Sequence, residues 1–142
     1  IEQAEYLPAY KSLNPSAFII PISGKGLWST LYGYLALADD YNTVKGITFY
    51  AHGETAGLGG EIDKKWFQDN FIGKKIYNSM GELIAINVVK GKANALLDKE
   101  SLKHGVDGIS GATITSKGVA SFLKRDLQRY KYFFNKRQII NE

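Results

Sequence analysis

The chain has 142 residues, of which 44% are hydrophobic and 23% charged, and its net charge at pH 7 is +4. This length and composition predict one globular domain, residues 1–142, with a hydrophobic core, and they exclude a disordered chain. The absence of cysteine excludes disulfide bonds, thiolate metal ligands and a cysteine nucleophile.

The apolar runs are too short to cross a membrane. The longest cover residues 17–22 and 35–38, whereas a bilayer needs about 20 apolar residues. The chain opens at Ile1 without a basic-then-apolar signal segment. We interpret this start as that of a processed or trimmed chain.

The first third of the chain predicts strands. Residues 1–13 are a short helix or an extended arm, and residues 17–22 form a short strand that Pro21 places at an edge or a strand end. Residues 28–38 and 44–51 are rich in Tyr, Leu, Ile and Thr, with turn-forming residues between them. This pair is the clearest antiparallel hairpin in the sequence.

The middle of the chain predicts a short helix and a further strand. Residues 62–71 have the spacing of a short amphipathic helix, and we expect Trp66 in the core. Residues 83–89 predict a strand, and residues 93–98 add a strand or a connection before the last helix.

The last helix has the strongest pattern. From about Lys117, apolar side chains recur at three- and four-residue spacing, at Val119, Phe122, Leu123, Leu127, Tyr130, Phe133 and Phe134. A helix of this length covers one face of a sheet. We therefore expect an α+β fold: an antiparallel sheet built from hairpins, packed by a long C-terminal helix and a short middle helix.

Positive charge is concentrated near the end of the chain. It comes from Lys124, Arg125, Arg129, Lys131, Lys136 and Arg137, with Asp126 and Glu142 in partial opposition. Cations late in a helix complement its dipole, which accounts for most of the cluster. No nucleic-acid-binding motif accompanies it, so contact with anionic lipid or with another protein of a complex is the other interpretation.

Residues 107–116, DGISGATITS, form a small, hydroxyl-rich segment just before the last helix. Thr115 and Ser116 stand where a helix N-terminus favours side-chain acceptors, so a plain helix cap is one interpretation. The small residues before Thr113 leave its hydroxyl open beside the positive end of the helix dipole, which suits a phosphate. The residues alone leave both interpretations open.

Two other segments are rich in glycine. Residues 23–29, SGKGLWS, put Trp28 beside a flexible turn, and residues 52–60, HGETAGLGG, let main chain approach a ligand closely. Such segments are either plain turns or the walls of a ligand slot.

Together the three segments resemble those of one family. Its flavin-attachment motif, Asp-x-x-Ser/Thr-Gly-Ala-Thr, is matched at Asp107, Ser110, Gly111, Ala112 and Thr113. The family comprises the FMN-binding domains of the C subunit of sodium-translocating NADH:quinone reductase and of the G subunit of the Rnf complex. Residues 24–28 and 52–59 resemble two further family segments in the same order, except that Ala56 replaces a proline. Residues 59–61 favour the sodium-pump branch over the Rnf branch.

The resemblance implies an electron-transfer domain with FMN joined through its phosphate to Thr113. The phosphate would be held at the helix start, by Ser110, Gly111, Ala112, Thr115 and Ser116. The flavin ring would lie among Lys25, Gly26, Leu27, Trp28, His52, Glu54, Thr55, Gly57, Leu58 and Gly59. We expect Trp28 or Leu58 to touch the ring. The resemblance also implies that Asp107 is read by a flavin transferase.

The resemblance further implies a place in a membrane complex that oxidises NADH, reduces quinone and moves sodium ions. The chain would be the soluble fragment of a longer subunit, on the extracytoplasmic (periplasmic) side, without its N-terminal membrane anchor. A cofactor-free interaction module is the competing hypothesis. No metal site is expected, because His52 and His104 stand apart in a chain without cysteine. No acid–base catalytic set and no nucleic-acid partner are expected either.

Overall fold

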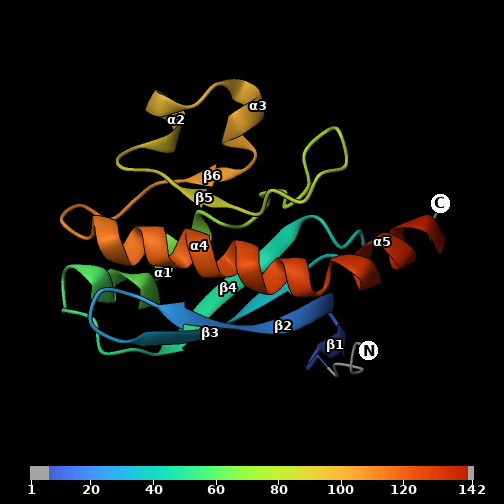
Figure 1. Ribbon diagram of the computed structural model, residues 1–142, viewed down its shortest axis with the longest axis horizontal. Coiled ribbons are helices and arrows are strands. Elements are labelled where there is room, and N and C mark those ends of the chain that lie inside the picture. The colour runs from blue at the N-terminus through green and yellow to red at the C-terminus, as the bar shows by residue number, and fades with distance from the viewer. Residues whose placement is uncertain (1–6, 141–142) are drawn as a thin grey trace, which may run out of the picture.

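The computed structural model describes residues 7–140, and side chains for residues 7–136. A four-stranded antiparallel sheet forms one layer (Figure 1), with strands in the order β1 (Tyr10–Leu13), β2 (Ser16–Lys25), β3 (Thr30–Leu37) and β4 (Val44–Ala51). The predicted hairpin is confirmed as β3 and β4. Its turn is held by Asp40, whose Oδ1 accepts hydrogen bonds from the N–H groups of Asn42 and Thr43.

The N-terminal part differs from the prediction. Residues 10–13 form β1 instead of a helix or an unpaired arm, and residues 1–6 lie outside the described part. β1 pairs only with residues 16–19 of β2. Pro21 pairs with Tyr34 of β3 but lies beyond the residues of β2 that pair with β1. It therefore stands within the strand, at a point where β2 has no neighbour on the β1 side, which is the edge position that proline tolerates.

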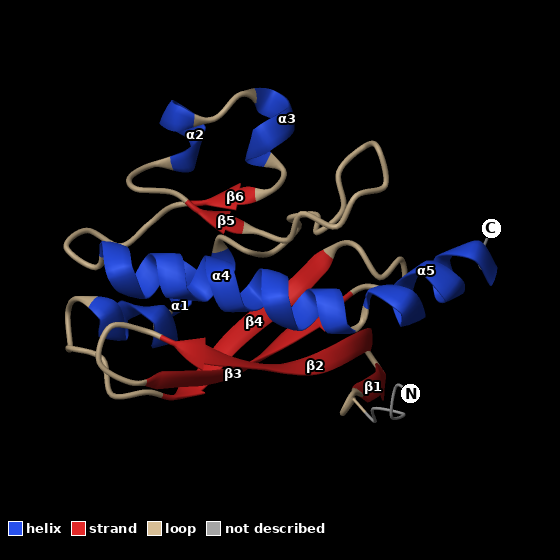
Figure 2. Cartoon of the chain, in the orientation of Figure 1, coloured by secondary structure: helices blue, strands red, loops and turns tan. Residues whose placement is uncertain are grey.

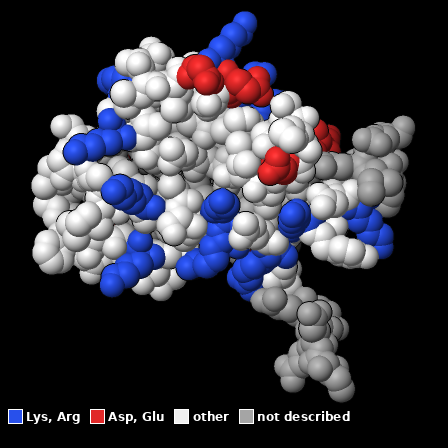
Figure 3. Space-filling model, turned by 45° about the horizontal axis from the view of Figure 1, so that its top comes forward, with Lys and Arg blue, Asp and Glu red and all other residues white. Residues whose placement is uncertain are grey.

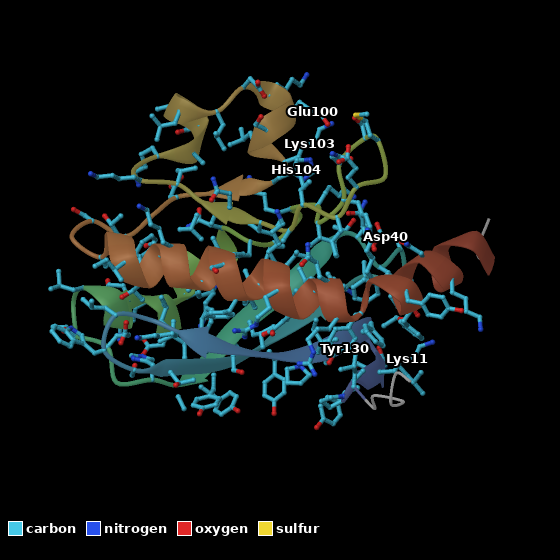
Figure 4. All side chains as sticks on the ribbon, in the orientation of Figure 1. Lys11, Asp40, Glu100, Lys103, His104 and Tyr130 are labelled. Atoms are coloured by element: carbon cyan, nitrogen blue, oxygen red, sulfur yellow. The ribbon has the colours of Figure 1, made fainter. Side chains whose placement is uncertain are left out.

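The long helix α4 (Thr113–Arg129) lies across one face of the sheet and packs mainly on β2. Its predicted apolar stripe is confirmed, since Val119, Phe122, Leu123, Leu127, Tyr130 and Phe134 are buried and Phe133 is half-buried. The helix is interrupted at Tyr130 and continues as α5 (Lys131–Ile140). Tyr130 lies beside the N-terminal strand (Figure 4), and its hydroxyl donates to the Pro8 carbonyl.

The predicted middle helix is shorter than expected. A 3-10 turn, η1 (Gly59–Asp63), leads into α1 (Lys65–Asp69). Phe67 is fully buried, whereas Trp66 is 42% exposed, so the prediction of a core Trp66 is wrong. Neighbouring residues of a short helix point in different directions, and Phe67 takes the inward one.

A second, two-stranded sheet lies on the other side of α4 from the main sheet (Figure 2). It pairs β5 (Asn87–Val88) with β6 (Gly105–Val106) in parallel. The strand predicted over residues 83–89 is thus reduced to two residues. Residues 93–98 contain the helix α2 (Ala93–Leu96) instead of a strand, followed by α3 (Lys99–Leu102). Parallel strands need such a crossover connection.

The basic residues of the last two helices lie on the surface. Figure 3 shows Lys and Arg side chains spread over one face of the molecule. Five basic residues of these helices are exposed: Lys124, Arg125, Arg129, Lys131 and Lys136. Arg137 and Glu142 lie outside the described side chains. Asp126 is buried, and its Oδ2 accepts from the Ser23 N–H at 3.0 Å. Its Oδ1 forms a salt bridge with Arg125 at 3.0 Å, so Asp126 opposes this one cation of the cluster, as predicted.

The α+β architecture is confirmed: an antiparallel sheet, a long C-terminal helix and short helices. Across residues 7–140, no helix is both long enough and apolar enough for a membrane span.

Candidate functional site

A single buried carboxylate joins the three glycine-rich segments. Glu54 Oε1 accepts hydrogen bonds from the Leu27 N–H at 2.7 Å and from the Thr115 hydroxyl at 2.8 Å. Glu54 Oε2 accepts from the Trp28 N–H at 3.0 Å and the Ser29 hydroxyl at 2.8 Å. The β2–β3 turn, the loop after β4 and the start of α4 therefore meet at one side chain.

This junction requires both the ionised carboxylate and glycine beside it. Burial alone would raise the pKa of Glu54, but the hydrogen bonds outweigh it and hold the pKa below its usual range. A Cβ on Gly26 would lie 2.3 Å from Glu54 Oε1, and one on Gly59 would lie 2.5 Å from Thr115 Oγ1. Only residues without a Cβ allow the segments to approach this closely.

His52 fixes the same loop from the other side. Its Nδ1 accepts from the Glu54 N–H at 3.1 Å, so the ring proton is on Nε2, which donates to Asp63 Oδ2 at 2.8 Å. This hydrogen bond from His52 is the main reason that the pKa of Asp63 lies below its usual range. The structure thus gives His52 and Glu54 internal roles in holding the loop.

The helix α4 begins at Thr113, four residues before the predicted start near Lys117. Its N-cap residue is Ala112, and neither a capping side chain nor an acidic residue occupies its first turn. The cap interpretation of Thr115 and Ser116 is therefore wrong. Both are buried inside the helix, where Ser116 Oγ accepts from the Ile109 N–H at 3.4 Å. Within residues 7–140, the N–H groups of residues 113–115 have no hydrogen-bond partner.

A cavity of about 470 Å³ opens beside this helix start. That volume lies within the range of about 300–1,000 Å³ that is usual for small-molecule sites. The half-buried Thr113 is on its wall. The remaining lining comes from Gly57, Glu61, Trp66, Val88, Val89, Lys90, Gly91, Lys92, Gly108, Ile109, Ser110, Gly111, Ser116 and Lys117.

The structure brings some of the predicted site residues onto this cavity and leaves others outside its lining. Ser110, Gly111, Thr113, Ser116 and Gly57 line it. Outside the lining are Lys25, Gly26, Leu27, Trp28, His52, Glu54, Thr55, Leu58, Gly59, Ala112 and Thr115.

Two of the residues outside the lining are large, exposed and close to the motif. Leu58 is 44% exposed, and a Cβ placed on Gly111 would lie 3.1 Å from Leu58 Cδ2. Trp28 is 70% exposed, and its N–H shares the Glu54 carboxylate with Thr115.

Sequence reasoning missed two other parts of the cavity wall. Trp66 and Glu61 form one of them, with the indole Nε1 donating to Glu61 Oε1 at 3.2 Å. Residues 88–92 form another. The run VVKGK, with lysines on both sides of Gly91, is the sequence signal that could have indicated this wall. No sequence signal indicated the wall formed by Trp66, because the position of Trp66 in the apolar spacing of residues 62–71 is that of a core residue.

Asp107, the first residue of the motif, caps a neighbouring helix. Its Oδ1 accepts from the Ala93 N–H at the start of α2 at 2.8 Å, and its Oδ2 lies 3.6 Å from Lys92 Nζ. The motif is thereby fixed to the crossover between β5 and β6. In the described part of the chain, no group of three or more His, Cys, Asp or Glu side chains is arranged for a metal ion.

Comparison with known proteins places this site in a family. The model of the FMN-binding domain family matches residues 26–128, which include Glu54 and every residue that donates a hydrogen bond to its carboxylate. The C subunit of the Na(+)-translocating NADH-quinone reductase of Haemophilus ducreyi is 53% identical over 106 residues, 75% of this chain and 38% of that protein. Its counterpart in Pseudomonas aeruginosa is 51% identical over 107 residues, 74% of this chain and 39% of that protein. The chain therefore spans about two-fifths of the length of these relatives.

Solved structures agree with the sequence comparison. The crystal structure of the C subunit from Parabacteroides distasonis superposes with a TM-score of 0.77 at 40% identity, covering 89% of this chain and 60% of that chain. NqrC of Shewanella oneidensis gives a TM-score of 0.74 at 36% identity, covering 87% of this chain and 55% of that one. The chain therefore belongs to the FMN-binding domain family, in the group formed by the C subunits of the Na(+)-translocating NADH-quinone reductases.

Proposed function

We propose that this chain is an electron-transfer domain carrying one FMN, joined through its phosphate to Thr113 Oγ1. The observation that carries the proposal is the position of Thr113. It is the first residue of a helix without a cap, it lines a cavity, and it ends the SGAT segment of an FMN-binding family member.

The residues around Thr113 fit a flavin phosphate. Three backbone N–H groups without partners among the described residues, together with the positive end of a 17-residue helix, favour an anion at this point. Gly111 has a φ of +73°, a conformation that residues with a side chain rarely adopt, and it turns the main chain into the helix. The cavity beside Thr113 has room for part of the nucleotide.

Bound FMN supplies the electron-accepting and electron-donating chemistry, and the chain supplies position and surroundings. The flavin ring is proposed to lie against Leu58 and Trp28, because both side chains are exposed. Leu58 lies close to Gly111, and the Trp28 N–H shares the Glu54 carboxylate with Thr115 of the helix start. The loop residues Lys25, Gly26, Leu27, His52, Glu54, Thr55, Gly57 and Gly59 then hold these walls in place. Ser110, Gly111, Ala112 and Ser116 surround the phosphate, and Thr115 fixes the helix start through Glu54.

The wider assignment follows the relatives. We propose that the chain acts within a sodium-translocating NADH:quinone reductase together with other subunits, and that the domain lies on the extracytoplasmic side of the cell membrane. A longer polypeptide would supply the membrane anchor. A flavin transferase would attach the cofactor, and it would read Asp107 as part of the motif. The Rnf branch is the alternative for the complex.

The attachment is tested by co-expressing the chain with a flavin transferase. After denaturation, the protein should stay yellow and gain the mass of FMN less one water, because ester formation releases water. Thr113→Ala should abolish the mass gain and Thr113→Ser should retain it. Thr48→Ala, an exposed threonine on β4, is the matched control and should label normally. A wild-type chain that stays colourless would favour a cofactor-free interaction module.

A further inference from the structure

Lys117 places a positive charge near the N-terminus of α4, where the helix dipole is itself positive. Lys117 lies four residues after Thr113, which puts the two side chains on the same side of the helix, and both line the cavity. Cations near a helix N-terminus are unfavourable, and the first turn here has no acidic residue to offset one. The arrangement becomes favourable when an anion occupies the same position.

The surroundings of Lys117 supply no anion of their own. Among the described residues, no carboxylate lies within ion-pair distance of its Nζ. The carboxylate on the cavity wall, Glu61, accepts the indole N–H of Trp66. Lys90 and Lys92 add two further cations to the same lining. Of the three lysines on this lining, Lys92 alone has a carboxylate partner among the described residues, Asp107.

We infer that Lys117 binds the phosphate of the cofactor and couples its attachment to the stability of the domain. This assignment rests on the proposed function, because the phosphodiester on Thr113 is the anion it needs. A phosphodiester retains about one negative charge, which the helix N-terminus and the Lys117 ammonium would share. Lys117 thus destabilises the flavin-free domain and stabilises the flavin-loaded one.

The test is a comparison of thermal unfolding with and without flavin. The wild type, Lys117→Gln, Lys25→Gln and Lys124→Gln are each prepared in both states, with loading measured by mass. Lys124 is the matched control, because it is exposed on the same helix but does not line the cavity. Lys117→Gln should raise the Tm of the flavin-free domain by about 1–3 °C, the size expected for a helix-dipole contribution in a domain of this length.

Flavin attachment should offset this gain. The increase in Tm on flavin attachment should be smaller in Lys117→Gln than in the wild type by about 2–5 °C, and unchanged in Lys124→Gln. The difference should fade in about 1 M NaCl, where charges are screened over roughly 3 Å.

Two results would overturn the assignment. Equal flavin-induced increases in Lys117→Gln and the wild type would show that Lys117 does not contact the phosphate. A reduced increase in Lys25→Gln alone would move this role to Lys25, the cation that the sequence motif favours. Both results presuppose loaded protein. If the wild type takes up no flavin, the proposed function itself fails.

Discussion

Glu54 holds three chain segments together only while its carboxyl group is ionised. The carboxylate accepts every one of its hydrogen bonds, from two backbone N–H groups and two hydroxyls. A protonated carboxyl group would have to donate a hydrogen bond through its O–H. Each of its four partners already donates to it in this arrangement. The lowered pKa of Glu54 is the consequence of this geometry.

Replacing Glu54 by Gln should lower stability at neutral pH and make the loss depend on pH. The amide retains one acceptor oxygen, so we expect Glu54→Gln to cost about 2 kcal/mol at pH 7. Because the folded-state pKa is lowered, the stabilisation by Glu54 is complete above its unfolded-state pKa. It is lost as the pH falls through the folded-state value.

Urea unfolding of the wild type and Glu54→Gln at pH 7 and at successively lower pH measures this dependence. The gap between the two proteins should narrow in acid. Glu82→Gln, at an exposed position, is the control and should track the wild type. A gap that stays constant with pH would contradict the role assigned to the charge.

At the scale of elements, α4 and the β2–β3 turn approach so closely that a helix residue must lack a side chain. A Cβ on Gly118 would lie 2.3 Å from the carbonyl oxygen of Lys25. The helix start and the turn are thus in backbone contact one turn away from the Glu54 junction.

Gly118→Ala should therefore destabilise the domain, by about 1–3 kcal/mol through overpacking. This sign is informative, because alanine in a helix interior ordinarily stabilises by close to 1 kcal/mol relative to glycine. Gly46→Ala on β4 is the matched control, since nothing lies within 4 Å of the added Cβ. It should change stability by no more than about 0.5 kcal/mol. Chemical denaturation measures both, and a more stable Gly118→Ala would contradict the close contact.

How far the elements follow from sequence depends on the range of the interactions that form them. The hairpin of β3 and β4 and the body of α4 were predicted because their periodicity and turn residues are local signals. β5 and β6 pair across 16 intervening residues, from Val88 to Gly105, so no local pattern marks them. The start of α4 was misplaced because the rule for caps expects a side-chain acceptor, and this helix has none.

The candidate site divides in the same way. Thr113 was identified from its motif, and the structure places it on a cavity. The role of Glu54 was not predictable, because its partners come from segments far apart in the chain. Trp66 was misassigned because helical spacing alone does not tell which of two neighbouring aromatic residues, Trp66 or Phe67, turns inward.

For the whole molecule, the C-terminal helices tie the ends of the described chain to the sheet. Phe134 on α5 is fully buried and stacks on Tyr41 at 5.9 Å between ring centroids. Its neighbour Phe133 stacks on Phe18 of β2 at 5.2 Å. These contacts make α5 part of the hydrophobic core.

Phe134→Ala should therefore destabilise the whole domain by about 3–5 kcal/mol, as loss of a fully buried aromatic ring does. Tyr132→Ala is the control on the same helix, because Tyr132 is 80% exposed, and it should have little effect. Circular dichroism and tyrosine fluorescence should report one shared transition in each protein. Separate melting of α5 in the wild type would show that it is not part of the core.

The shared carboxylate at Glu54 also limits how the proposed flavin can move. One oxygen accepts from both the β2–β3 turn and the first turn of α4, so rotation of the helix start would break a bond to the turn as well. Thr113 therefore sits on a stiff support with little independent travel. The distance between the flavin and a redox partner would therefore depend on how the entire domain docks. Movement of the attachment site within the domain would change that distance little.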